Sequence, residues 1–233
     1  MKIIFLGDSL TEGTPGVSFF APLKESFSNH KLINYGKGGD TVSSLLARLK
    51  RLDLKANIIV LFVGANDVFV KVSWTFSVYK TITKQKWAKD KTTFKDKYDA
   101  LLSKVTEKAT HVIVIPPLLI GEQLDNEYNQ LLKEYRESIE HLVNTYQNID
   151  YIDLHQEFKN YLDAKESSDY IAKSLKSIMQ DVRNLKTKEE IDCVSQDRGL
   201  HVTLDGVHLN STGALIITRK LEEVLTYYIN KET

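Results

Sequence analysis

Residues 2–10 read KIIFLGDSL, and this stretch predicts the class of fold. Four consecutive apolar side chains at residues 3–6 are followed at once by Gly7, Asp8 and Ser9. A short continuous apolar run of this kind is typical of a strand buried on both faces of a parallel sheet. We therefore expect a buried strand that ends in a turn, with Ser9 placed where the next helix begins.

The same pattern recurs along the chain. Further strands are expected at residues 31–34, 57–63, 111–115 and 149–154, which are rich in Ile, Val and Leu. Apolar residues at helical spacing lie between or after them, at 42–52, 94–105, 124–146 and 217–228. This alternation predicts right-handed βαβ crossovers and an α/β fold, a three-layer α/β/α sandwich around a parallel sheet of about five strands.

A length of 233 residues predicts one domain over residues 1–233. Two stretches interrupt the alternation, at about 68–93 and 156–200, and we interpret them as insertions at the carboxyl edge of the sheet. The first is rich in aromatic residues, which suit an acyl pocket or lid and equally suit core packing or a dimer contact. The second carries apolar residues at helical spacing from Tyr170 to Val182 and predicts an amphipathic helix packed on the body.

Charge and cysteine content exclude several classes of function. The 31 Lys and Arg residues balance 31 Asp and Glu residues, so no basic field favours nucleic acid or an anionic membrane surface. Cys193 is the only cysteine, which rules out an internal disulfide and predicts a small half-buried side chain. The apolar run at residues 3–6 is too short for a signal peptide or a stable membrane anchor, so we expect a cytoplasmic protein. A monomer and a homodimer both fit the sequence.

Two loops predict a nucleophile and its base. Ser9 follows a strand and opens a helix, where outward backbone N–H groups suit an attack that creates an oxyanion, although a helix cap is the simpler interpretation of an isolated Gly-Asp-Ser. Asp205 and His208 stand just ahead of the final helix. At this spacing Asp205 can accept a hydrogen bond from the His208 Nδ1–H, which leaves Nε2 free to take the proton of a serine.

Two further loops offer hydrogen-bond donors. Residues 34–41 read NYGKGGDT, and their glycines permit positive φ angles that aim an N–H group into a cleft. Residues 64–67 read GAND, in which the Asn66 amide can donate to an oxyanion. Each loop also fits an ordinary turn, because Asn and Asp readily bond their own backbone.

The four blocks stand in the order typical of the SGNH hydrolase superfamily, the GDSL-type esterases and lipases. From residue 2 to the final helix the chain resembles this superfamily, which implies a flavodoxin-like SGNH hydrolase fold. The resemblance further implies that Ser9 is the nucleophile, that His208 is the general base and that Asp205 orients the base.

The resemblance also implies an oxyanion hole made by the Ser9 N–H, the Gly39 N–H and the Asn66 side chain. Gly38 stands directly before the matched glycine, so either glycine can be the backbone donor. Two carboxylates inside the matched blocks, Asp8 and Asp67, are expected to support the site.

The function implied is serine-dependent hydrolysis of a small-molecule carboxylic ester through an acyl-enzyme on Ser9, with no metal or cofactor. One alternative is a metal-dependent phosphoesterase, but such sites cluster several His and carboxylate ligands, and His208 is the single well-placed histidine. The other alternative is a non-catalytic protein that binds a ligand on the same fold. Hydrolysis that a chelator does not affect would exclude the metal-dependent enzyme, whereas ligand binding without turnover would favour the non-catalytic protein.

Overall fold

The computed structural model describes residues 1–231, and its centre is one parallel sheet of five strands in the order β2-β1-β3-β4-β5. The strands are β1 (Lys2–Gly7), β2 (Lys31–Gly36), β3 (Ala56–Phe62), β4 (Ala109–Ile115) and β5 (Ile149–Tyr151). The chain reverses its direction of progress across the sheet after β2, so β1 lies between β2 and β3. In open parallel sheets ligands bind beside such a reversal, at the carboxyl ends of the strands.

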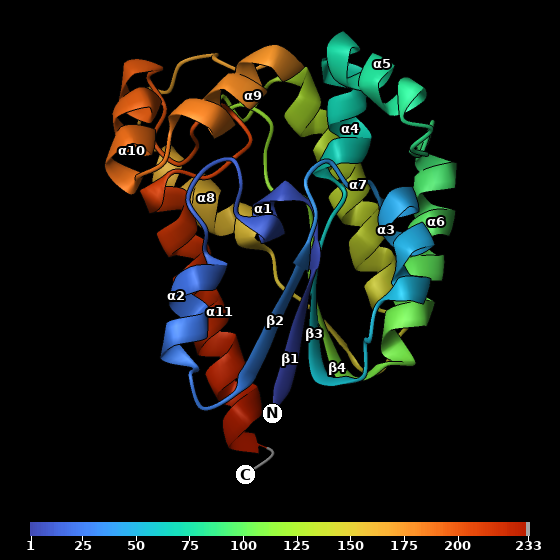
Figure 1. Cartoon of the computed structure of the whole chain (residues 1–233). Coiled ribbons are helices and arrows are strands. Elements are labelled where there is room, and N and C mark those ends of the chain that lie inside the picture. The colour runs from blue at the N-terminus through green and yellow to red at the C-terminus, as the bar shows by residue number, and fades with distance from the viewer. Residues whose placement is uncertain (232–233) are drawn as a thin grey trace.

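Helices cover both faces of the sheet (Figure 1). One layer holds α2 (Phe20–Ser26), α8 (Leu154–Leu162) and α11 (Ser211–Lys231), and the other holds α3 (Val42–Arg48), α6 (Lys91–Thr106) and α7 (Glu127–Val143). A 3₁₀ turn, Leu49–Arg51, continues α3. The remaining helices lie at the carboxyl ends of the strands: α1 (Ser9–Glu12), α4 (Ala65–Val72), α5 (Trp74–Ile82), α9 (Leu175–Asn184) and α10 (Lys188–Asp197).

Two apolar cores lie on opposite faces of the sheet. In β1, Ile4 and Leu6 pack into the core beneath α3, α6 and α7, whereas Ile3 and Phe5 pack into the core beneath α2, α8 and α11. All four side chains are fully buried, as expected of a strand that is covered on both faces. The predicted α/β/α sandwich with five parallel strands is therefore confirmed.

Several predicted boundaries were wrong, and capping side chains explain two of them. The strand expected at 149–154 ends at Tyr151, because Asp153 accepts a hydrogen bond from the His155 N–H and starts α8. The helix expected over 124–146 begins at Glu127, where Asn126 caps it. Helix α2 was not predicted, and Tyr170 lies outside α9.

The two stretches interpreted as insertions form most of the helical layer that lies at the carboxyl ends of the strands. Residues 68–93 contain most of α4 and all of α5, while 156–200 contain α9, α10 and most of α8, which packs beside α11 instead. The division into one domain with two insertions stays a prediction. Cys193 is exposed rather than half-buried. Among residues 1–231, no helix is both long enough and apolar enough to cross a membrane.

Candidate active site

Ser9 lies beyond the carboxyl end of β1, an inner strand of the sheet, as the first residue of α1. The Asp8 side chain caps this helix by accepting a hydrogen bond from the Leu10 N–H at 3.1 Å. The turn packs so tightly that a Cβ on Gly7 would lie 2.2 Å from the Phe62 carbonyl oxygen, so only glycine fits there. The turn therefore presents the Ser9 hydroxyl at the edge of the sheet.

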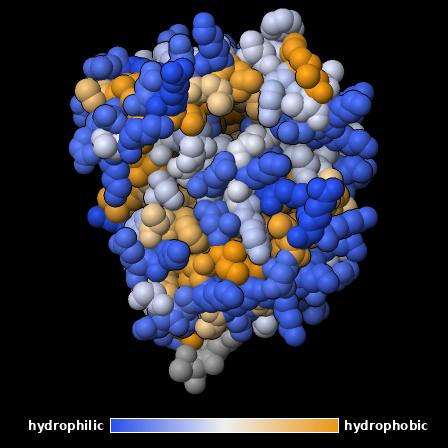
Figure 2. Space-filling view, in the orientation of Figure 1, coloured by the Kyte–Doolittle hydropathy of each residue, from blue (hydrophilic) through white to orange (hydrophobic). Residues whose placement is uncertain are grey.

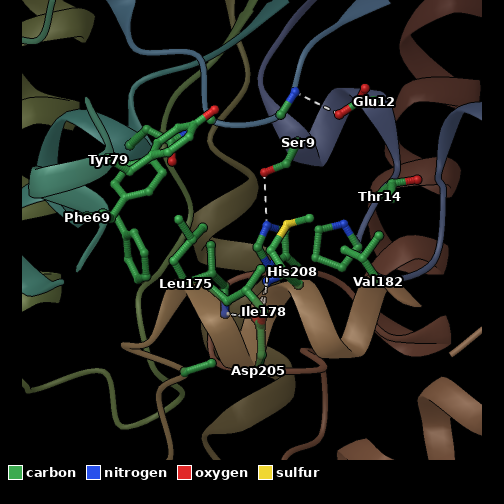
Figure 3. Close-up of a pocket in the computed structure, with 18 residues that line it drawn as sticks. Ser9, Glu12, Thr14, Phe69, Tyr79, Leu175, Ile178, Val182, Asp205 and His208 are labelled. Atoms are coloured by element: carbon green, nitrogen blue, oxygen red, sulfur yellow. Dashed lines mark hydrogen bonds and ion pairs between the residues drawn. The ribbon is translucent and has the colours of Figure 1, made fainter. Parts of the chain in front are cut away.

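His208 and Asp205 meet Ser9 from the far end of the chain. The Ser9 Oγ lies 2.9 Å from the His208 Nε2, and the His208 Nδ1 lies 2.7 Å from an oxygen of Asp205 (Figure 3). The other Asp205 oxygen accepts the backbone N–H groups of Val207 and His208 at 3.0 and 2.8 Å. The structure thus forms the relay of hydroxyl, imidazole and carboxylate that the sequence predicted.

The electrostatics of this pair favour a charged imidazole. Burial opposes protonation of His208, but the adjacent Asp205 carboxylate outweighs it, so the pKa of His208 is raised above 6.5. Burial alone would raise the pKa of Asp205, yet His208 and the backbone N–H groups hold it below 3.8. Asp205 therefore stays ionised, and its negative charge favours the protonated form of His208.

Glu122 holds the loop that carries Asp205 in place, a role that no sequence pattern predicted. Its buried carboxylate accepts the backbone N–H groups of His201, Val202 and Thr203 at 2.8 to 2.9 Å, together with the Thr203 hydroxyl at 2.7 Å. The separation of 81 residues between Glu122 and Thr203 is why no local pattern links them. Charge-assisted bonds of this kind are among the strongest that a carboxylate makes.

Replacing Glu122 by alanine is expected to lower the free energy of unfolding by about 3–5 kcal/mol, because the buried N–H groups of Val202 and Thr203 and the part-buried N–H of His201 lose their acceptor. Urea unfolding followed by circular dichroism measures the change. Gln123→Ala, at the exposed neighbouring position, is the control and should leave stability within about 0.5 kcal/mol. A Glu122→Ala variant as stable as the control would contradict the assigned role.

The glycine loop and Asn66 lie beside Ser9. The Gly38 N–H donates to the Glu12 carboxylate at 2.7 Å, whereas the Gly39 N–H makes no hydrogen bond within residues 1–231. Gly39 has a φ of +75°, a conformation that favours glycine. The Asn66 side-chain amide donates one of its two hydrogens to the Asp40 carbonyl oxygen at 3.0 Å, so the other hydrogen is available to a ligand. Of the two glycines considered, Gly39 is therefore the one with a free donor.

Asp67 and Asp8 are buried carboxylates that hold the loops in place. Asp67 accepts the Val42 N–H at 2.9 Å and the Ala88 N–H at 3.0 Å, so it ties α3 and the segment after α5 to α4. Burial raises the pKa of Asp67 to about 6 and that of Asp8 to about 7. The supporting role expected for both residues stays a prediction, and these contacts are consistent with it.

A pocket of about 420 Å³ opens over Ser9 and His208. Figure 2 shows it as a hollow with an apolar floor between the α9 and α5 regions. Phe69 and Tyr79 line one side, Val182 and Thr14 line the other, and Leu175 and Ile178 of α9 lie between them (Figure 3). The sequence predicted a pocket role only for the aromatic stretch. The wall from α9 was missed, because an apolar helical face usually packs on a core.

Outside this relay, the titratable groups form no evident metal centre. Within the described residues, 1–231, no group of three or more His, Cys, Asp or Glu side chains is arranged to hold a metal ion. Lys80 is a further residue that the sequence did not single out. It is buried, and its Nζ donates a hydrogen bond to the Gly39 carbonyl oxygen in the glycine loop.

Known structures share this arrangement of the backbone. An acetyl xylan esterase, AlAXEase, is 22% identical, with 96% of this chain and 99% of that chain covered and a TM-score of 0.64. A catalytic mutant of Axe2, an acetylxylan esterase from Geobacillus stearothermophilus, is 16% identical, with 94% and 90% covered and a TM-score of 0.67. LAE5, an α/β hydrolase from the metagenome of Lake Arreo in Spain, is 18% identical, with 93% and 91% covered and a TM-score of 0.63. At these identities the likeness shows the fold.

The sequence comparisons complete the assignment. No curated protein matches the sequence significantly. The model of the GDSL-like lipase/acylhydrolase family matches residues 5–215, which is most of the chain and spans all four blocks. The chain therefore belongs to the GDSL-like lipase/acylhydrolase family and is a carboxylic ester hydrolase.

Proposed function

We propose that this enzyme hydrolyses esters of apolar carboxylic acids through a covalent acyl-enzyme on Ser9. The observation that carries the proposal is the relay of Ser9, His208 and Asp205, with contacts of 2.9 and 2.7 Å, at the floor of a mainly apolar pocket. A nucleophile, its base and the group that orients the base are recognised by this geometry and not by their order in the chain.

The first half of the reaction transfers the acyl group to the enzyme. The Ser9 Oγ attacks the ester carbonyl carbon while the His208 Nε2 takes the hydroxyl proton. The carbonyl oxygen becomes an oxyanion, and the proposed donors to it are the Ser9 N–H, the Gly39 N–H and the second Asn66 amide hydrogen. As the tetrahedral intermediate collapses, the bond to the alcohol oxygen breaks, and His208 gives its proton to the departing alcohol.

The second half releases the acid. A water molecule takes the place of the alcohol, His208 takes one of its protons, and the water oxygen attacks the acyl carbon. The bond to the Ser9 Oγ then breaks, and the proton on His208 returns to that oxygen. Asp205 keeps its charge throughout and stabilises the imidazolium in both halves.

The shape of the pocket supports an apolar acyl chain longer than acetyl. Phe69 and Tyr79 from one side and Leu175 and Ile178 from α9 enclose the space next to the Ser9 hydroxyl. Phe76, whose ring lies against those of Phe69 and Tyr79, also lines the pocket. A volume of about 420 Å³ falls in the usual range for small-molecule sites. Burying each added methylene of the acyl chain against these walls lowers the free energy by about 0.8 kcal/mol.

The test is hydrolysis of p-nitrophenyl esters from acetyl to dodecanoyl, measured with and without a chelator. We expect chelator-resistant activity, with kcat/KM rising about three- to fourfold per added methylene until the pocket is filled. Strong preference for acetyl would contradict the substrate class while leaving the serine mechanism in place. Activity that the chelator abolishes would support the metal-dependent phosphoesterase, and ligand binding without turnover would support the non-catalytic protein.

A substitution in α9 tests the pocket itself. Ile178→Trp should fill part of the pocket and shift the preferred acyl chain to a shorter length, with the largest loss, about 10-fold or more, for the longest esters. Gln180→Trp, on the exposed side of the same helix, is the matched control and should keep the wild-type profile. If the two variants share one chain-length profile, the acyl group lies elsewhere.

A further inference from the structure

Lys80 is a fully buried cation on α5, behind the glycine loop. Its side chain has 0% exposure, and its Nζ lies 5.0 Å from the centre of the Phe76 ring, which lines the pocket. The Nζ donates hydrogen bonds to the Gly39 carbonyl oxygen and to the Gln85 side chain. A buried lysine is costly unless it is paired, so a lysine at this position indicates a specific task.

Charged groups from three segments face the Lys80 ammonium. Asp8 follows β1, Asp40 and Lys37 belong to the loop after β2, and Asp67 lies in α4. Burial lowers the pKa of Lys80 to about 8, against the opposing effect of the three carboxylates. The side chain is therefore mainly charged at neutral pH and brings a positive charge close to Gly39.

Several backbone polar groups around Gly39 are each hydrogen-bonded to a different side chain. The Gly38 N–H is bound by Glu12, the Gly39 carbonyl by Lys80, and the Asp40 carbonyl by Asn66. In this turn the Gly39 N–H is left without a partner within residues 1–231, and Gly39 lines the pocket together with Ser9. Because Lys80 bonds the carbonyl of the same residue, it limits rotation of the Gly39 backbone and so fixes the direction of this N–H.

We propose that Lys80 is a positioning residue for ester hydrolysis, which clamps the Gly39 carbonyl so that the Gly39 N–H stays aimed at the oxyanion formed when Ser9 attacks. The inference rests on the proposed serine mechanism. Donors that are held in place before the reaction stabilise developing charge without reorganisation, which lowers the barrier. Lys80 acts through Gly39 and does not itself touch the substrate.

The first test replaces the ammonium by a neutral side chain of similar length. Lys80→Met should lower kcat about 10- to 100-fold with KM changed less than about threefold, because a misaligned donor forfeits part of the 100- to 1000-fold that one oxyanion donor supplies. Lys89→Met removes the same charge from an exposed position nearby and should keep the wild-type kcat. A folded Lys80→Met enzyme with wild-type kcat would overturn the inference.

The second test uses pH and keeps the cation. As the pH rises through about 8, Lys80 loses its proton and a charge-assisted bond to Gly39 becomes a weaker neutral one, so kcat should fall severalfold on the alkaline side. Burial also raises the pKa of Asp67 to about 6 and that of Asp8 to about 7, and a variant of Lys80 that keeps both carboxylates separates their titration from that of the lysine. Lys80→Arg stays charged throughout, so its alkaline fall should vanish. If Lys80 had only a structural role, Lys80→Arg would show the same alkaline fall in kcat as the wild-type enzyme. That result would also overturn the inference.

The two tests cover the case in which Lys80→Met fails to fold, since the profile of Lys80→Arg then decides. They also separate this inference from the proposed function. Activity that survives Ser9→Ala would refute the serine mechanism, whereas an inactive Ser9→Ala together with a fully active, folded Lys80→Met would refute only the role of Lys80.

Discussion

Ser9→Ala is expected to lower kcat for ester hydrolysis by on the order of 10⁴-fold or more. The variant has no oxygen to attack the carbonyl carbon, and His208, 2.9 Å from the lost hydroxyl, can then only assist a water molecule that nothing positions. Losses of this size follow removal of the nucleophile in serine hydrolases generally, because the remaining groups retain only part of their effect. Initial rates with the best p-nitrophenyl ester measure the loss.

The variant should stay folded, because alanine fits the space of serine at the start of α1 and Asp8 still caps the helix. Ser103→Ala, at an exposed serine on α6, is the control and should keep full activity. If purified Ser9→Ala hydrolyses esters at a tenth of the wild-type rate or more, another group is the nucleophile.

Asp205→Asn is expected to lower kcat by about 10⁴-fold at neutral pH, because the amide no longer secures the tautomer that leaves Nε2 free to accept a proton. In the wild-type enzyme the base must be neutral, so kcat/KM should fall as the pH drops through a midpoint above 6.5, the direction in which Asp205 moves the pKa of His208. Without the carboxylate this midpoint should move down. Rates between pH 5 and 9 measure both effects.

The matched control for Asp205→Asn is Asp163→Asn, which neutralises an exposed carboxylate at the end of α8 and should change neither kcat nor the midpoint. Circular dichroism checks the fold, since an oxygen of the Asp205 side chain also accepts the backbone N–H groups of Val207 and His208 at 3.0 and 2.8 Å. A folded Asp205→Asn enzyme with the wild-type midpoint would refute the pairing of Asp205 with His208 as the source of the raised pKa.

The sequence predicted the parts of this structure that local chemistry determines. Apolar runs such as residues 2–6 require cover on both faces and so predict buried parallel strands. Because the carboxyl ends of parallel strands meet at one edge, loops that follow different strands bring Ser9, Gly39 and Asn66 to one place. The spacing of Asp205 and His208 allowed their hydrogen bond to be predicted without knowledge of the rest of the fold.

Features that depend on contacts between residues far apart in the chain could not be predicted from the sequence. Glu122 and Lys80 are charged side chains, which usually lie on the surface, and only the folded chain shows that each is buried against a loop of the site. Nothing in residues 175–182 distinguishes a helix that packs on a core from one that walls a pocket. Element ends also depended on single capping residues, as Asp153 and Asn126 show.

The most direct test of the central claim is to locate the covalent bond. After reaction with diethyl p-nitrophenyl phosphate, which phosphorylates an activated serine and releases p-nitrophenol, the intact mass and the peptide map of the inactivated enzyme are recorded. The serine mechanism predicts one phosphoryl group per chain, attached to the Ser9 Oγ, and no such group in Ser9→Ala. Stoichiometric attachment to another residue, or full esterase activity in an enzyme phosphorylated at Ser9, would contradict it.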